Sequence, residues 1–378
     1  MLRKILTFFQ KETVLSISAI LAILSMFIVH PSGKYFSYID FRTLSLLFCL
    51  MSIVAGLSEI GLFDYLAEKI LSRANSIKSI IVLLVLLCFF FSMIITNDVA
   101  LITFVPFAII ILKKMSEKQK NYWILRTVVM QTIAANLGSM LTPIGNPQNL
   151  YLYGKSGMSI GGFVLLMLPY TLVSLLLLLA WAALVCQKAS AALSVDELVS
   201  SSASQGEQKI ILLYLVLFAV CLLSVIRVLP YGIAFAAVLV CVLFADPRTL
   251  RAVDYSLLLT FVAFFIFIGN LGRIPAFSGW LQEFLTGREV LVAVLASQVT
   301  SNVPAALLLS GFTAETQALI IGTNLGGLGT LIASMASLIS YRQIARELPQ
   351  GKKQYFGLFT LSNLIFLALL LGVWFLLR

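Results

Sequence analysis

The chain of 378 residues is 60% hydrophobic and only 11% charged, whereas a typical soluble domain is about a quarter charged. A soluble fold of this length could not bury so much apolar surface, so the composition excludes a water-soluble enzyme and predicts a polytopic membrane protein. The net charge of +10 comes from basic residues that lie between the apolar segments. This distribution favours a role in membrane topology, with the lipid bilayer as partner, over nucleic-acid binding.

The sequence offers no set of soft metal ligands. Its five cysteines are scattered and His30 is its one histidine. They form neither a Cys-x-x-Cys pair nor a cysteine–histidine cluster. We therefore expect no cofactor.

Apolar segments of spanning length predict nine transmembrane helices. The first follows three basic residues and is not followed by a small-residue cleavage site, which predicts a retained signal anchor. The nine segments are 14–29, 43–58, 121–142, 160–186, 210–226, 230–245, 255–271, 316–341 and 354–377.

Two further apolar segments are interrupted by polar residues near their middle. The segment 290–312 is broken at Thr300-Ser301-Asn302, and its arms of about 11 and 9 residues would reach half-way through the hydrocarbon. The segment 79–112 is broken at Thr96-Asn97-Asp98. Both predict re-entrant hairpins with polar tips deep in the membrane. For 79–112, two full helices joined by an ordinary turn are the alternative.

A polar, Ser-rich segment without apolar periodicity divides the chain and predicts a flexible cytoplasmic linker. The two parts share one order of elements, a hairpin followed by a broken helix. The predicted organisation is a first repeat over 1–187 (hairpin 79–112, broken helix 121–152), the linker over 188–209, and an extra helix plus second repeat over 210–378 (hairpin 290–312, broken helix 316–341).

Polar residues recur at matching places in the two parts, which predicts an internal repeat. Asn136-Leu137-Gly138 matches Asn324-Leu325-Gly326 at an offset of 188, at which Gly145-Asn146 falls on Ala333-Ser334. The hairpin tips match at an offset of 205. An odd number of crossings separates the repeats, so the second is inverted relative to the first. Inverted repeats are common in secondary transporters.

The basic residues predict the orientation. Nineteen of the 26 lysines and arginines fall on the side of the N-terminus and seven on the opposite side. Because basic residues are concentrated in cytoplasmic loops, we expect a cytoplasmic N-terminus and an external C-terminus.

The two tips and the two helix breaks predict a central binding site, because unwound backbone at membrane depth is tolerated where it lines a cavity. Half-helix N-termini can hold an anion, and Asn, Ser and Thr oxygens can coordinate Na⁺. Close helix packing is the alternative role for such small and polar residues. The candidate residues are Thr96, Asn97, Asp98, Asn136, Thr142, Gly145, Asn146, Ser301, Asn302, Asn324, Thr330 and Ser334.

Three motifs resemble signature regions of the ion transporter superfamily, in its divalent anion:sodium symporter and citrate-transporter-like branch. They are TNDVALITFVP (96–106), NLGSMLTPIGNPQN (136–149) and SQVTSNVPA (297–305), and the resemblance covers roughly residues 14–375. It implies two facing hairpins, transport of small carboxylate or inorganic anions coupled to Na⁺ or H⁺ by an elevator motion, the cell (inner) membrane, and usually a homodimer.

The same resemblance implies where the coupling ion binds. It assigns Na⁺ sites to Thr96, Asn97 and Asn146, and to Ser301, Asn302 and Ser334. The sequence departs from the pattern at the third tip position, which is Asp98 in one half and Val303 in the other, and the second break lacks prolines. These departures leave the anion and the coupling ion open.

Asp98 also supports a second reading, a cation/proton antiporter or metalloid oxyanion exporter on the same fold, because an intramembrane carboxylate is a common proton or Na⁺ relay. An enzyme is disfavoured because no base accompanies a Ser or Cys in the polar motifs. A passive channel is disfavoured because the sequence supplies no charged ring.

Overall fold

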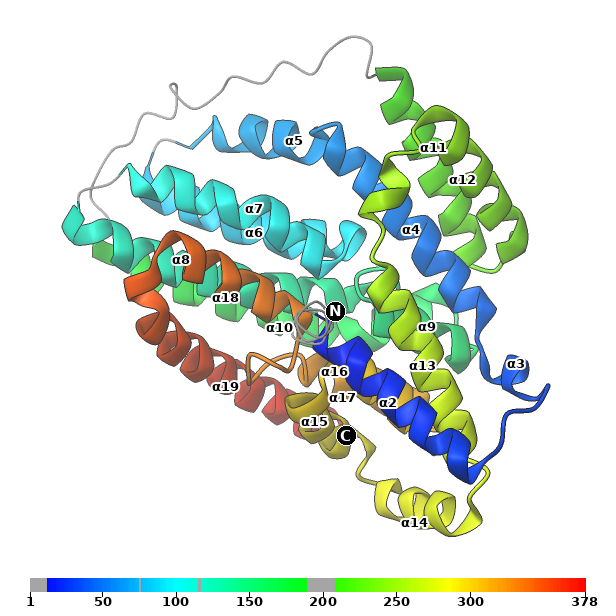
Figure 1. Ribbon diagram of the computed structural model, residues 1–378. Coiled ribbons are helices and arrows are strands. Elements are labelled where there is room, and N and C mark those ends of the chain that lie inside the picture. The colour runs from blue at the N-terminus through cyan, green and yellow to red at the C-terminus, as the bar shows by residue number, and fades with distance from the viewer. Residues whose placement is uncertain (1–11, 75, 115–116, 189–207) are drawn as a thin grey trace, which may run out of the picture.

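The computed structural model describes residues 12–74, 76–114, 117–188 and 208–378 (Figure 1). Over these residues the regular structure is entirely helical, which confirms the predicted all-α class. All but the ends of the predicted linker lies outside the described residues. The α-helices are α2 (Thr13–Ile28), α3 (Tyr35–Tyr38), α4 (Phe41–Glu59), α5 (Leu62–Leu71), α6 (Ile77–Ile95), α7 (Asn97–Lys113), α8 (Glu117–Gly138), α9 (Pro147–Ser156), α10 (Ile160–Val185), α11 (Gln208–Val225), α12 (Tyr231–Ala245), α13 (Tyr255–Leu271), α14 (Pro275–Leu285), α15 (Glu289–Thr300), α16 (Asn302–Leu309), α17 (Thr316–Leu325), α18 (Met335–Glu347) and α19 (Lys352–Leu377).

Six spans among the described helices are long and apolar enough to cross a membrane; they contain α4, α6, α8, α10, α11 and α19. A seventh is obtained if α13 and α14, bent by 104° at their junction, are counted as one span. The predicted number of nine is not confirmed. Helices α2 and α12 have 16 and 15 residues, and the predicted segment 316–341 is divided by a non-helical stretch between α17 and α18.

The helices that open the two repeats begin in the same way. The Asp40 carboxylate accepts a hydrogen bond from the Thr43 backbone N–H at 3.0 Å, and the Asp254 carboxylate accepts one from Leu257 N–H at 2.9 Å. Such caps satisfy backbone donors that the first turn leaves free. Each of the two helices is followed by a short amphipathic helix, α5 and α14.

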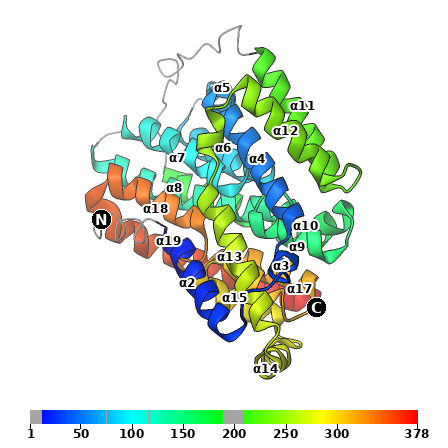
Figure 2. The same ribbon diagram turned by 45° about the vertical axis from the view of Figure 1, so that its right-hand side comes forward.

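The helices pack in two groups (Figures 1 and 2). In the first group α2 packs against α13, and α4 packs against α11 and α12. In the second group the hairpin α6–α7 packs against α8, α18 packs against α7 and α8, and the hairpin α15–α16 packs against α17. Contacts of α13 with α16 and of α4 with α9 join the groups. The predicted polar elements therefore lie in the second group.

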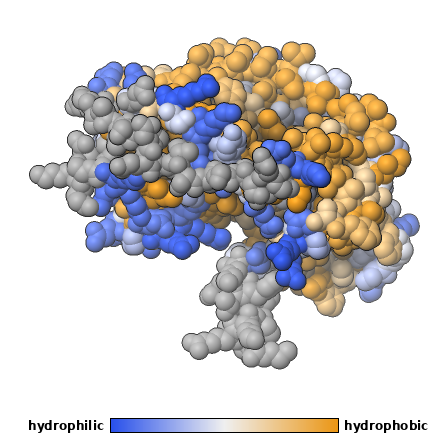
Figure 3. Space-filling model, turned by 90° about the horizontal axis from the view of Figure 1, so that it is seen from above, coloured by the Kyte–Doolittle hydropathy of each residue, from blue (hydrophilic) through white to orange (hydrophobic). Residues whose placement is uncertain are grey.

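Large apolar side chains remain exposed along several helices. Phe244 on α12 is 86% exposed and Leu176 on α10 is 66% exposed. Figure 3 shows apolar residues covering much of one face, with hydrophilic residues gathered to one side. Contiguous apolar surface of this extent fits contact with lipid, and the chain is therefore a multi-pass membrane protein.

Candidate functional site

The two hairpin tips have the same unusual backbone conformation. Thr96 joins α6 to α7 with φ 75° and ψ 153°, and Ser301 joins α15 to α16 with φ 78° and ψ 155°. This region of backbone space is occupied almost only by glycine, and another residue there carries about 1–3 kcal/mol of strain. The surroundings of both tips must hold this conformation in place.

Each tip is fixed to the helix break of its own repeat. The backbone N–H of Asn97 donates to the Gly145 carbonyl at 3.3 Å, and that of Asn302 donates to the Ala333 carbonyl at 3.0 Å. The sequence offset of 188 pairs Gly145 with Ala333. The following residues, Asn146 and Ser334, have extended backbones and precede α9 and α18.

Side chains then connect the two repeats to each other. Ser334 Oγ donates to Asn136 Oδ1 at 2.9 Å, and Asn146 Nδ2 donates to Asn324 Oδ1 at 3.3 Å. Asn97 Nδ2 also donates to Asn136 Oδ1, at 3.1 Å. In the first two pairs, one residue comes from a broken helix of one repeat and the other from the break of the opposite repeat. Asn97 and Asn136 both belong to the first repeat.

The hydrogen bonds between the repeats continue one helical turn further, to two residues that are absent from the predicted site. Asn136 Nδ2 donates to Ser337 Oγ at 3.4 Å, and Asn324 Nδ2 donates to Asn149 Oδ1 at 2.6 Å. Asn149 and Ser337 are completely buried. The offset of 188 pairs them in the sequence, and this was the signal that could have identified them.

Two predicted residues, Thr142 and Thr330, do not join this cluster of asparagine and serine side chains. Thr142 Oγ1 donates to the Met93 carbonyl at 2.5 Å, and Thr330 Oγ1 donates to the Gln298 carbonyl at 3.1 Å. Thr330 is exposed. Both hydroxyls therefore attach a helix break to the first arm of its own hairpin, in corresponding places.

Asp98 begins the second arm of the first hairpin and is unlike its counterpart Val303. Its backbone N–H donates to Asn97 Oδ1 at 2.9 Å. Its carboxylate Oδ1 is buried and has no hydrogen-bond partner among the described residues. Asp254 is an acidic group that interacts with it electrostatically. An unpartnered carboxylate oxygen in this setting is suited to hold a proton or a cation.

Four helices start at the cluster: α7, α9, α16 and α18. Their N-termini carry partial positive charge, which favours an anion. Acceptor oxygens occur beside them, since Asn146 Oδ1 is also buried without a partner in the described part of the chain. The arrangement thus offers positive helix ends to an anion and oxygens to a cation within one buried site.

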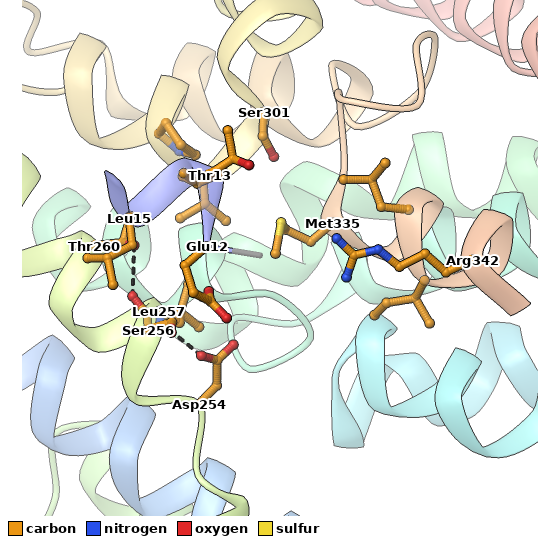
Figure 4. Close-up of a pocket in the computed structure, with 15 residues that line it drawn as sticks. Glu12, Thr13, Leu15, Asp254, Ser256, Leu257, Thr260, Ser301, Met335 and Arg342 are labelled. Atoms are coloured by element: carbon orange, nitrogen blue, oxygen red, sulfur yellow. Dashed lines mark hydrogen bonds between the residues drawn. The ribbon is translucent and has the colours of Figure 1, made fainter. Parts of the chain in front are cut away.

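A cavity of about 130 Å³ reaches the second tip, where Ser301 lines it together with Val303 and Pro304. In Figure 4 the carboxylates of Glu12 and Asp254 lie on one side of this cavity and the Arg342 guanidinium extends toward it from the other. These three residues belong to segments that the charge distribution predicts to be cytoplasmic. The cavity therefore gives access to Ser301 from the predicted cytoplasmic side.

Known proteins resemble this chain over most of its length. Residues 5–320 match the family described as citrate transporter. The inner membrane protein YbiR of Escherichia coli is 33% identical over 84% of both chains. The transporter MJ0456 of Methanocaldococcus jannaschii is 31% identical over 87% of both chains, and the human P protein is 32% identical over 33% of this chain and 15% of its own. The chain therefore belongs to the citrate transporter family.

Proposed function

We propose that the chain is a secondary active transporter of small anions, carboxylate or inorganic, coupled to Na⁺ or H⁺. The observation that carries the proposal is the convergence of four helix N-termini on a buried cluster that both repeats build together. The family to which the chain belongs supports an anion as substrate.

Two unpartnered oxygens support coupling to a cation or a proton. Asn146 Oδ1 and Asp98 Oδ1 are buried acceptors in the first repeat, and buried acceptors without partners cost free energy unless a ligand supplies the missing interaction. Na⁺ or a proton would do so. Thr96 and Asn97 immediately precede Asp98 in the chain, and the Asn97 N–H donates to Gly145, the residue before Asn146. Ser301, Asn302 and Ser334 form the corresponding set in the second repeat.

Alternating access belongs to the same proposal. The matching tip conformations and the matching tip-to-break hydrogen bonds support two inverted repeats. We place the protein in the inner membrane, as the name of YbiR suggests, with the N-terminus in the cytoplasm. The second group of helices then moves against the first in an elevator motion that exposes the cluster to either side.

A second candidate is a cation/proton antiporter or metalloid oxyanion exporter. The specific observation in its favour is the presence of acidic side chains. Asp98 has a buried oxygen without a partner among the described residues, and Glu12 and Asp254 face the cavity that leads to the second tip. Carboxylates at these places would attract cations.

The deciding experiment is flux into proteoliposomes containing the purified protein. Labelled citrate, succinate, sulfate and phosphate are offered separately under a Na⁺ gradient and under a pH gradient, with empty liposomes as control. Gradient-dependent accumulation of one of the four supports the proposal. Cation exchange without movement of any of these anions would favour the second candidate, and would overturn the first.

A further inference from the structure

Gln148, the second residue of α9, is 1% exposed. Its Nε2 atom is buried and has no hydrogen-bond partner among the described residues. Its neighbours are different, because Asn146 and Asn149 both donate hydrogen bonds from their side-chain amides. A buried amide donor without a partner destabilises a fold unless something else accepts its hydrogen bonds.

The face of α9 on which Gln148 lies can be identified from its neighbours. Residues at i, i+3 and i+7 share one face of a helix, so Gln148 lies with Tyr151 and Lys155. The Tyr151 ring packs against Phe261 and Phe265 of α13. Its hydroxyl lies 2.8 Å from Ser310 Oγ, and Lys155 Nζ donates to the Ser310 carbonyl. This face of α9 is therefore turned toward α13 and the second hairpin.

Depth along the helix follows from the same contacts. Ser310 ends the second arm at the end away from the tip, while Asn302 begins it at the tip. Gln148 precedes Tyr151 by about one turn toward the start of α9, so it lies nearer to the level of Asn302 and Val303. Val303 of α16 and Thr260 of α13 line the cavity of about 130 Å³ that reaches the second tip.

The unpartnered atoms of the site fall into two classes, according to the sign of the ion that each would bind. Asn146 Oδ1 and Asp98 Oδ1 are acceptors, suited to a cation, whereas Gln148 Nε2 is a donor, suited to an anion. We propose that Gln148 contacts the transported anion, donating its carboxamide hydrogens to the oxygens of a carboxylate or tetrahedral oxyanion. This rests on the proposed function and names a residue of its substrate site.

A neutral donor suits this task. The amide nitrogen offers two donor hydrogens to anion oxygens, and it carries no net charge that would hold the anion too firmly for release. Gln148 would therefore set affinity for the anion, while the cation is held by other residues.

The test is Gln148→Met, which keeps the length of the side chain and removes both hydrogen-bonding atoms. Concentration-dependent uptake of citrate and of sulfate is measured in proteoliposomes. We expect the KM of the transported anion to rise about tenfold, with the maximal rate and the dependence on Na⁺ and pH preserved. We also expect the anion-free protein in detergent to melt at the same temperature as the wild type or higher, because a buried unpartnered group has been removed.

Gln131→Met is the matched control, because Gln131 is a buried glutamine of α8 whose Nε2 donates to the Phe104 carbonyl at 3.0 Å. It should melt at a lower temperature and keep the wild-type KM. Gln148→Glu, which places a negative charge at the same position, provides a second variant, and it should remove the thermal stabilisation that citrate or sulfate gives the wild type. An unchanged KM in Gln148→Met, or unchanged stabilisation in Gln148→Glu, would overturn the assignment. Absence of flux for every anion in the wild type would instead overturn the proposed function, and this inference with it.

Discussion

Ser301 combines backbone strain with a position at the end of the cavity. Its φ of 78° is unfavourable for any side chain, while its hydroxyl is the only polar group that its side chain can offer to a ligand. Glycine would relieve the strain and remove the hydroxyl together. Alanine would remove the hydroxyl alone, so the two substitutions separate the contributions to stability and transport.

We expect Ser301→Gly to melt at a higher temperature than Ser301→Ala, by the equivalent of about 1–3 kcal/mol. Both variants should lose transport by a similar factor, since both lack the hydroxyl. Thermal unfolding in detergent and flux in proteoliposomes measure the two effects. Equal melting temperatures for the two variants would show that the tip backbone is not strained, and wild-type flux in Ser301→Ala would exclude the hydroxyl from the site.

Asp98 poses an electrostatic problem for anion binding. An ionised carboxylate at the centre of a membrane costs about 2.5–3.5 kcal/mol by insertion measurements, and it repels a nearby anion strongly in a medium of low dielectric constant. Neutralisation by a proton or a cation removes both penalties. Anion binding would then require the coupling ion at Asp98.

Asp98→Asn removes this charge and keeps the shape of the side chain. We expect exchange of anion across the membrane to persist in the variant and accumulation driven by a Na⁺ or pH gradient to disappear. Counterflow and gradient-driven uptake in the same proteoliposomes distinguish the two activities. Gradient-driven uptake with unchanged pH and Na⁺ dependence would assign Asp98 a structural role.

Particular residues show how far the sequence could predict the site. Asn97 and Asn302 were identified because polar residues in an apolar segment leave few interpretations other than a buried tip. Gln148, by contrast, is singled out only because its Nε2 atom has no hydrogen-bond partner in the described part of the structure, which no motif encodes. Thr330 was assigned to the cluster by alignment with Thr142. The hydroxyls of both residues instead donate to carbonyls of the hairpins. The direction of these side chains depends on the backbone dihedral angles of each break, which the sequence does not reveal.

At the scale of elements, close approach of backbone fixes each hairpin on its broken helix. A Cβ atom at Gly138 would lie 1.9 Å from the Phe89 carbonyl oxygen, and one at Gly326 would lie 2.6 Å from Ser297 Oγ. The offset of 205 that relates the hairpins pairs Ser297 with Ser92, which lies 2.7 Å from the Cβ position of Gly138. The contacts of α6 with α8 and of α15 with α17 thus depend on glycine at corresponding places.

Gly138→Ala should therefore destabilise the protein by about 1–3 kcal/mol or more, because the new methyl group meets backbone that cannot move aside. Gly372→Ala is the matched control, since Gly372 lies within α19 and has no atom within 4 Å of its Cβ position. It should stabilise the helix by about 0.5–1 kcal/mol. Melting temperatures in detergent compare the two; equal temperatures would mean that α6 and α8 have room to separate.

The number of crossings was the least predictable property of these elements. The match with the first repeat predicts a broken helix over 316–341, but hydropathy alone could not show that α17 ends at Leu325 and α18 begins only at Met335. Helix α6, predicted as one arm of a re-entrant hairpin, has 19 residues. The length of an apolar segment is thus a poor guide to the number of membrane crossings where a helix ends inside the protein.

At the scale of the whole molecule, the distribution of charge makes a prediction about sidedness. In a cysteine-free background, Ser32→Cys and Thr286→Cys should react with a membrane-impermeant maleimide in intact cells. Gln350→Cys should react only after the cells are permeabilised. All three positions are exposed, so differences in labelling report the side of the membrane. Labelling of Gln350→Cys in intact cells would reverse the orientation.

The hydrogen bonds exchanged between the repeats have a thermodynamic consequence. Asn136 of α8 contacts Ser334 in the second break, and Asn324 of α17 contacts Asn146 in the first break. An ion that orders the second break would therefore also order α8, which leads into the first break, and the reverse holds for the first break and α17. Two ligands bound at such shared side chains are cooperative, because the first offsets part of the entropy that the second would lose. Cooperativity of this kind is reciprocal: for the cation and anion that we propose as ligands, each would tighten binding of the other by the same factor.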